Sequence, residues 1–203
     1  KEATVVTAEN VVVKDKSGKI VTSVEKAFDG NAIKATDFTI TDAEGKKIDG
    51  TTAKLVDADG KDVPEALNAG SYKLVIENEN VVFQGEAVVP ITINKVDLST
   101  IKVGAEATKK FDKTNNAAIT YVPKGTEVAG LDLKYQSGTD EDGEPEWDAL
   151  PAAAKVTVKD ASGKEVTKLK NEGIYTIEIS AADDDAALNY TFPAEVSITV
   201  ADV

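Results

Sequence analysis

Short β-favouring runs separated by turn-forming residues constrain the fold of this chain more than any other feature. Val, Ile, Thr and Tyr gather in runs of several residues, and Gly, Asp, Asn and Pro separate these runs along the whole chain of 203 residues. No segment keeps a helical apolar period for long, so the pattern predicts an all-β fold. Alanine is dense at 149–155 and 181–188, where we expect short helical turns.

A local unit of strand, Asp, Gly and strand occurs four times, at 13–20, 40–48, 56–63 and 158–166. The Asp side chain can accept hydrogen bonds from neighbouring backbone N–H groups, and the glycine three residues later can adopt the left-handed conformation that closes a hairpin. We therefore predict four β-hairpins, in which Gly60 and Gly163 are structural turn residues.

A larger repeat relates the two halves of the chain at an offset of 103 residues. Asn-Ala-Gly-Ser-Tyr at 68–72 matches Asn-Glu-Gly-Ile-Tyr at 171–175, so Gly70 and Gly173 precede equivalent strands. Each of these strands alternates apolar and polar side chains, and so does a closing strand near the end of each half. Each half therefore has a sheet with one apolar face, and in a chain with few helices a second sheet must cover it. The prediction is two immunoglobulin-like β-sandwich domains in tandem, at residues 1–97 and 98–203.

Three motifs of the first half resemble the bacterial immunoglobulin-like repeats of the MBG/YDG kind: Phe-Asp-Gly at 28–30, the motif at 68–72 and Phe-Gln-Gly at 83–85. The second half has Phe-Asp-Lys at 111–113, the motif at 171–175 and Tyr-Thr-Phe at 190–192, so it lacks two of the glycines. Such repeats occur in tandem on Gram-positive surface and adhesin proteins, and S-layer proteins share their composition. The resemblance implies an extracellular, cell-surface or cell-wall location, with neighbouring domains of the same surface protein as partners.

The composition excludes several functional classes. The chain has no histidine, cysteine or methionine, so Ser-His-Asp and Cys-His catalytic systems and the common histidine and thiolate metal sites cannot form. A formal net charge of -13 opposes binding to nucleic acid or to an anionic membrane. No apolar stretch approaches the ~20 residues that span a bilayer. We expect no direct membrane insertion and interpret the chain as part of a longer surface protein.

One segment, 139–148, concentrates side chains that could recognise a ligand. Six carboxylates surround Gly143, Pro145 and the single tryptophan, Trp147: these are Asp140, Glu141, Asp142, Glu144, Glu146 and Asp148. We find no counterpart in the first half and expect a long solvated acidic loop with Trp147 packed against its domain. In one alternative, Asp140, Glu141, Asp142 and Glu144 hold a calcium ion. In another, Trp147 anchors a recognition loop.

Two smaller acidic segments are interpreted as structural. Residues 57–62 resemble a calcium loop, but Lys61 places a positive charge in it and the distal glutamate is missing, which indicates a turn. Residues 183–185 are expected to form a solvated turn. Some surface domains of this kind contain an intramolecular Lys–Asn isopeptide bond, but no motif assigns its residues here.

These observations favour a non-catalytic module without a bound cofactor. A glycosidase would need aromatic stacking platforms, and the aromatic fraction is only 5%. We expect a structural spacer or adhesive module of a stalk or surface lattice. The alternative is a binding module that uses 139–148 to hold a host protein, a cell-wall or host glycan, or calcium.

Overall fold

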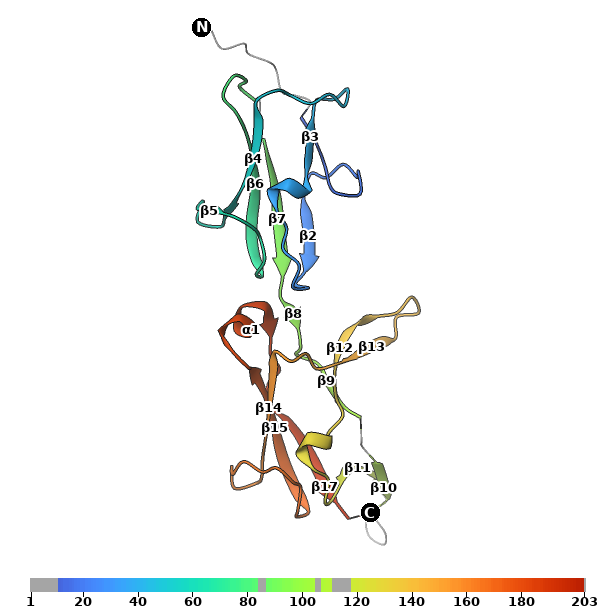
Figure 1. Cartoon of the computed structure of the whole chain (residues 1–203). Helices are drawn as coiled ribbons and strands as arrows, with labels where there is room; N and C mark the ends of the chain where they lie inside the picture. Colours follow the sequence, from blue (N-terminus) through green and yellow to red (C-terminus); the bar gives the residue numbers. More distant parts are fainter. Residues whose placement is uncertain (1–10, 84–86, 105–106, 111–117, 203) are drawn as a thin grey trace. The chain divides into compact units, whose positions relative to one another are not determined.

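The computed structural model describes residues 11–83, 87–104, 107–110 and 118–202, and it separates into two compact units. Unit 1 comprises Lys1–Lys95 and unit 2 comprises Val96–Val203. Most regular structure in the described residues is β-strand, arranged in several sheets, as the sequence predicts. Figure 1 shows these strands along the chain. The motif at 111–113 and two residues of the motif at 83–85 lie outside the described residues.

Unit 1 contains a five-stranded sheet in the order β2-β7-β6-β4-β5 and a two-stranded sheet of β1 and β3. Strand β2 runs parallel to β7, whereas the other neighbours in this unit are antiparallel. The bounds are β1 (Val12–Lys14), β2 (Val24–Ala27), η1 (Ala35–Asp37, a 3-10 helix), β3 (Thr39–Thr41), β4 (Thr51–Asp57), β5 (Asp62–Val63), β6 (Gly70–Asn78) and β7 (Val88–Asn94).

Unit 2 contains a five-stranded sheet (β10-β11-β17-β15-β14), a three-stranded sheet (β13-β12-β9) and the pair β16-β8. Strand β11 runs parallel to β17, and β16 runs parallel to β8. The bounds are β8 (Val96–Asp97), β9 (Ile101–Val103), β10 (Ala107–Lys110), β11 (Ala118–Pro123), η2 (Val128–Gly130), β12 (Leu133–Thr139), β13 (Pro145–Ala149), β14 (Ala154–Lys159), β15 (Gly173–Ala181), α1 (Asp184–Asn189), β16 (Tyr190–Thr191) and β17 (Val196–Ala201).

Each unit has its own hydrophobic core, to which both of its larger sheets contribute. In unit 1, Val13 of β1 lies in one buried cluster with Leu74 of β6 and Ile91 of β7. In unit 2, Leu133 of β12 lies in a cluster with Ile177 of β15. The apolar face of each central strand is therefore covered by side chains from a second sheet.

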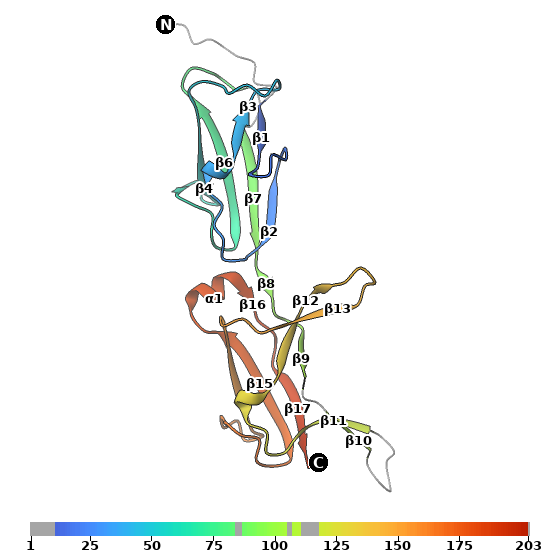
Figure 2. The same cartoon turned by 45° about the vertical axis from the view of Figure 1, so that its right-hand side comes forward.

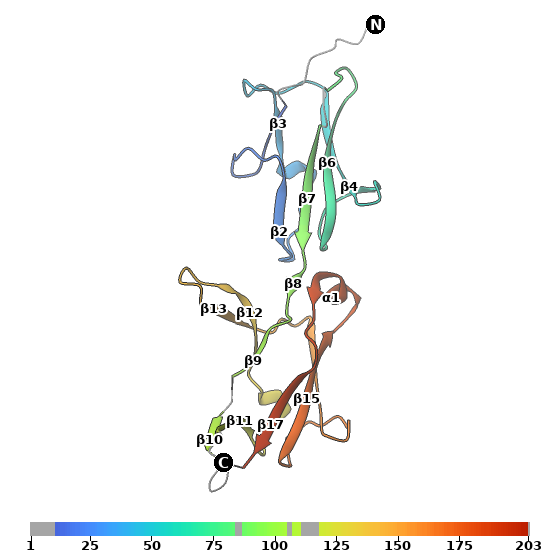
Figure 3. The ribbon, with the colours of Figure 1, turned by 180° about the vertical axis from the view of Figure 1, so that it is seen from behind.

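The two units use the same strand pairing. Tyr72 lies opposite Ile91 in the β6–β7 ladder, and Tyr175 lies opposite Ile198 in the β15–β17 ladder. These pairs occupy the same places in the repeat, so the ladders confirm the predicted match of the closing strands. Figure 3 shows β15 beside β17 and β6 beside β7.

The four predicted hairpin turns form as expected. In the turn at 57–61, Asp57 Oδ1 accepts hydrogen bonds from the backbone N–H groups of Asp59 and Lys61, each at 3.0 Å. Gly60 N–H donates to the Asp57 carbonyl at 3.0 Å. The turns that begin at Asp15, Asp42 and Asp160 repeat this pattern. Gly60 and Gly163 have φ of 79° and 82°, the left-handed conformation that the prediction requires.

Of the two expected helical turns, one is present. Helix α1 (Asp184–Asn189) overlaps the helical turn predicted at 181–188. The stretch at 149–155 is not helical, because Ala149 ends β13 and Ala154 begins β14, with a turn closed by Ala154 N–H donating to the Pro151 carbonyl at 2.9 Å. Pairing of β14 with β15 overrides the helical preference of alanine here.

Substitution of Gly163 tests the turn geometry, with Gly130 as a matched control. Neither glycine has a neighbouring atom within 4 Å of an added Cβ, but only Gly163 has a positive φ, of 82°. We expect Gly163→Ala to lower the free energy of unfolding by about 1–2 kcal/mol, because an L-residue is strained in this conformation. Gly130→Ala should be neutral or stabilising by less than about 1 kcal/mol. Urea unfolding of both variants measures the difference, and equal effects would contradict the assignment.

Candidate functional site

The acidic segment 139–148 belongs to a β-hairpin and is not the long loop that the sequence suggested. Strands β12 and β13 pair antiparallel, with Thr139 opposite Pro145 next to the turn. Asp140 Oδ1 accepts hydrogen bonds from the backbone N–H groups of Asp142 and Glu144, each at 2.9 Å. Gly143 N–H donates to the Asp140 carbonyl at 3.1 Å. Figures 1 and 2 show this hairpin extending away from the five-stranded sheet of its unit.

This hairpin has a structural counterpart in unit 1, which was not predicted from the sequence, although that counterpart lacks the crowded carboxylates and the tryptophan. Strand β12 pairs with β9 as β3 pairs with β1, and a 3-10 helix precedes both β3 and β12. The turn after β3 begins at Asp42 and has the same hydrogen bonds as the turn after β12. The Asp-x-x-Gly spacing of Asp140 and Gly143 was a usable signal. It was missed because Glu144 stands where the other four turns have lysine.

The four carboxylates proposed for calcium do not converge. Asp140 Oδ1 is occupied by two backbone N–H groups of its own turn. Asp140, Glu141, Asp142 and Glu144 are all exposed. Within the part of the chain that the structure describes, no group of three acidic side chains is arranged to hold a metal ion.

Trp147 lies on the outer face of the three-stranded sheet. It is half-buried and stands opposite Gln136, while the neighbouring pair of Leu133 and Val103 faces the core. The Lys102 ammonium lies 5.5 Å from the centroid of the Trp147 ring. A cation over an aromatic face at this distance contributes about 0.5–1 kcal/mol at an exposed site. Trp147 is therefore held in place by a strand neighbour and still presents ring surface.

The tripeptide 183–185 is exposed, as expected, but it begins helix α1 and does not form a separate turn. Asp183 Oδ1 accepts a hydrogen bond from Ala186 N–H at 2.8 Å, and Asp184 and Asp185 occupy the first turn. Carboxylates stabilise a helix N-terminus because they face its unpaired N–H groups. These acids have a structural function.

The repeated Asn-x-Gly-x-Tyr motif forms a closed corner in both units. Tyr72 Oη donates to the Asn68 carbonyl at 2.9 Å, and Tyr175 Oη donates to the Asn171 carbonyl at 3.1 Å. Gly70 and Gly173, which start β6 and β15, both have positive φ, 156° and 139°. The tyrosine hydroxyl thus ties each strand start to the chain segment before it. The sequence identified these positions, but not the partner of the hydroxyl.

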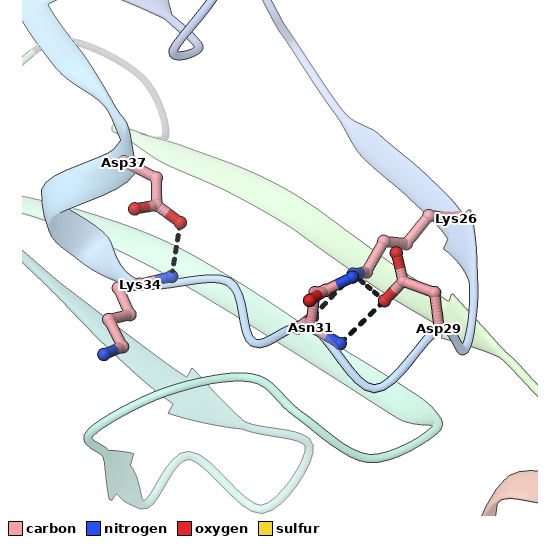
Figure 4. Close-up of polar contacts among 5 residues, drawn as sticks. All are labelled: Lys26, Asp29, Asn31, Lys34 and Asp37. Atoms are coloured by element: carbon pink, nitrogen blue, oxygen red, sulfur yellow. Dashed lines mark hydrogen bonds and ion pairs between the residues drawn. The ribbon is translucent and has the colours of Figure 1, made fainter.

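A second polar cluster lies in unit 1, around the Phe-Asp-Gly motif. Lys26 Nζ lies 2.7 Å from Asp29 Oδ1 and donates to the Asn31 carbonyl at 2.6 Å (Figure 4). The Lys26 ammonium and then the Asn31 N–H lower the pKa of Asp29 to about 2. Figure 4 also shows Lys34 N–H donating to Asp37, at 2.9 Å. The aspartate of the motif therefore fixes the segment after β2.

Comparison with known proteins gives only distant structural matches. No family model matches the chain, and no curated protein matches it. A glucan-utilisation protein of Bacteroides ovatus, SGBP-B, solved with a mixed-linkage heptasaccharide, matches with 12% identity and a TM-score of 0.23, covering 96% of this chain and 71% of that chain. The N-terminal part of the bacterial S-layer protein SbsC matches with 10% identity and a TM-score of 0.25, covering 99% and 39%. Both are bacterial cell-surface proteins, and at these TM-scores the likeness carries no argument.

Among the described helices, none has the length and apolar character needed to cross a membrane.

The pKa of Asp29 tests the Lys26 contact. We expect Lys26→Gln to raise the pKa of Asp29 from about 2 towards the ordinary value of about 3.9. Because the folded-state pKa is lowered, the contact stabilises the fold above the unfolded pKa and its contribution is lost as the pH falls through about 2. An NMR titration of the carboxyl carbon measures the midpoint. Lys46→Gln, next to Glu44, is the control, and an unchanged Asp29 midpoint in Lys26→Gln would reject the contact.

Proposed function

We propose that this chain forms two immunoglobulin-like sandwich modules that act as a non-catalytic, load-bearing spacer in a larger bacterial cell-surface protein. Three features support the modules: strand pairing that repeats between units, two sheets around each core, and a tyrosine corner in each unit. A tyrosine whose hydroxyl bonds back to the preceding segment is a hallmark of immunoglobulin-like sandwiches.

The parallel pairing of β2 with β7 carries the proposal. The chain passes through β2 early in unit 1 and leaves the unit at the end of β7. Four residue pairs join the two strands, from Val24 opposite Ile91 to Ala27 opposite Asn94, and Phe28 N–H donates to the Asn94 carbonyl at 2.8 Å. Tension on the two ends of the unit pulls these parallel strands in opposite directions. The hydrogen bonds are then loaded together, and one cannot break before the others.

We call the parallel β2–β7 pairing a clamp, and unit 2 has a shorter clamp of the same kind. Strand β11 pairs with β17 at two positions, Val122 with Val200 and Pro123 with Ala201. Proline has no N–H group to donate. Lys124 extends the contact, because its N–H donates to the Ala201 carbonyl at 2.8 Å and its ammonium lies 2.9 Å from Asp202. We therefore infer that unit 2 yields before unit 1 under load.

The remaining surface is consistent with a spacer and gives no support to catalysis. The chain has no histidine or cysteine, and the hydrogen-bonded carboxylates in its repeated turns hold backbone N–H groups. The high negative charge keeps such a module soluble and opposes self-association. An extracellular location on the cell surface or in the cell wall, with adjoining domains as partners, fits both a stalk and a surface lattice.

Single-molecule force spectroscopy on the full chain tests the clamp. We expect two unfolding events, with the weaker event belonging to unit 2 because its clamp is shorter. Unit 2 is longer, so at ~3.5 Å per residue its released contour length should exceed that of unit 1 by roughly 4.5 nm. Asp202→Asn should lower the unfolding force of unit 2 and leave that of unit 1 unchanged, because it weakens the contact with Lys124. Asp132→Asn, which alters a distant ion pair of the same unit, is the control. The proposal would be contradicted if unit 1 unfolded at a lower force than unit 2.

The binding hypothesis rests on one specific difference between the equivalent hairpins. Unit 1 has Lys46 and Lys47 after its turn glycine, where unit 2 has Glu144 and Pro145. The unit 2 hairpin also presents Trp147 on its outer face. An acidic tip beside a half-buried aromatic side chain that still presents ring surface is suited to a basic host protein or a glycan.

The calcium version of this hypothesis has a direct test. We expect calorimetric titration with millimolar calcium to give no binding heat and no shift in Tm, because the turn carboxylates are not arranged around a common point. Saturable heat that Asp142→Asn and Glu144→Gln abolish would overturn this expectation. The control is Asp59→Asn in the turn at 57–61, which should leave any heat unchanged.

A further inference from the structure

A groove of about 690 Å³ lies beside β14 in unit 2. Its apolar lining comes from side chains at the border of the unit 2 core: Val128, Leu131, Leu150, Val156, Val158 and Val166. All of these except Val158 are only partly buried. The core of unit 2 is therefore open to solvent along this edge.

Part of the backbone of β14 is unpaired beside the groove. Strand β14 is at the edge of its sheet and pairs with β15 on one side, while on the other side only its end is bridged, through Lys159 and Glu165. Ala182 N–H donates to the Ala153 carbonyl across the ladder, and Val166 N–H donates to the Val158 carbonyl from the opposite side. Backbone groups alternate in direction along a strand, so the N–H and C=O of Val156 point away from β15, on the same side as the Val158 carbonyl. Among the described residues, no strand pairs with them.

The equivalent edge in unit 1 differs by a charged side chain. The end of β4 pairs with β5 as the end of β14 pairs with 165–166, but Lys54 on β4 forms ion pairs with Asp62 at 3.3 Å and Glu77 at 3.2 Å. Lysine on an edge strand discourages pairing with another chain. The equivalent residue in unit 2 is Thr157, so this protection is missing beside the groove.

The charged side chains that line the groove are all acidic: Glu127, Asp132 and Glu165. Lys168 lies 2.9 Å from Glu127, and Lys134 lies 3.9 Å from Asp132. Glu165 forms no ion pair with any described residue. The groove therefore combines an apolar floor, free strand hydrogen-bonding groups and a negative rim.

We propose that this groove binds an extended peptide segment in which apolar and basic residues alternate. The peptide adds to β14 as a further strand and bonds to the N–H and C=O of Val156. Its apolar side chains cover Leu131 and Leu150, and its basic side chains reach the carboxylates of the rim. A second copy of this chain is a poor occupant, because each copy has a net charge of -13 and would bring a second acidic rim to the first.

Fluorescence anisotropy with the full chain and the labelled peptide Lys-Val-Lys-Val-Lys-Val tests the proposal. We expect saturable binding that weakens at least tenfold for the charge-inverted peptide Glu-Val-Glu-Val-Glu-Val. Val156→Pro should weaken binding at least tenfold, because it removes the N–H that faces the groove while leaving the bonds to β15. Thr157→Lys, which introduces the lysine of unit 1, should weaken it as well and is a second variant if Val156→Pro fails to fold. Ala53→Pro at the equivalent place in β4 is the control and should bind like the wild type.

Three results would overturn the proposal. The first is no binding at millimolar peptide. The second is that folded Val156→Pro and Thr157→Lys variants bind the peptide as tightly as the wild type does, which would place the peptide elsewhere. The third is a dimer in analytical ultracentrifugation that Val156→Pro dissociates, which would make a second copy the occupant. None of these results depends on the force at which either unit unfolds, so the spacer proposal stands or falls separately.

Discussion

The antiparallel pairing of each central strand with its closing strand is the constraint on which both units depend. In β6, Leu74 and Ile76 point into the core, and in β15 Ile177 and Ile179 do the same. Apolar and polar side chains alternate along these strands, so each sheet has one apolar face, and burial of that face requires a second sheet. The positive-φ glycine and tyrosine corner at the start of each central strand fix where the alternation begins. A slip of one residue would turn the whole apolar row towards solvent.

The same local chemistry sets the hairpins around this frame. Five turns have an aspartate whose Oδ1 accepts two backbone N–H groups, followed by a glycine of positive φ. Each turn thereby satisfies donors that the sharp bend withdraws from the ladder. These five aspartates are therefore structural. An acidic, glycine-containing segment of this chain cannot be interpreted as a metal site from its composition.

Local patterns predict those parts of the structure that depend on neighbours in sequence. The hairpin turns, the strand starts at Gly70 and Gly173 and the match of the closing strands are such cases. The parallel pairing of β2 with β7 was not predicted, because nothing in a four-residue strand identifies a partner far along the chain. Residues 145–148 were expected to belong to a loop, so the sequence assigned Trp147 to no face of a sheet. With β13 in place, the pairing of Trp147 with Gln136 determines the face on which the ring lies.

The differences between the units lie on surfaces that the shared frame leaves unconstrained. Lys54 and Thr157 have equivalent ladder positions, and the two units differ there in edge charge and in the ion pairs that Lys54 forms with Asp62 and Glu77. Lys46 and Glu144 differ in the same way at the tips of equivalent hairpins. Neither difference disturbs a turn hydrogen bond or a buried side chain, because both lie at exposed or half-buried positions of the same frame. The repeated frame therefore fixes the cores and the turns, and it leaves the charge of the sheet edge and of the hairpin tip free to differ between the units.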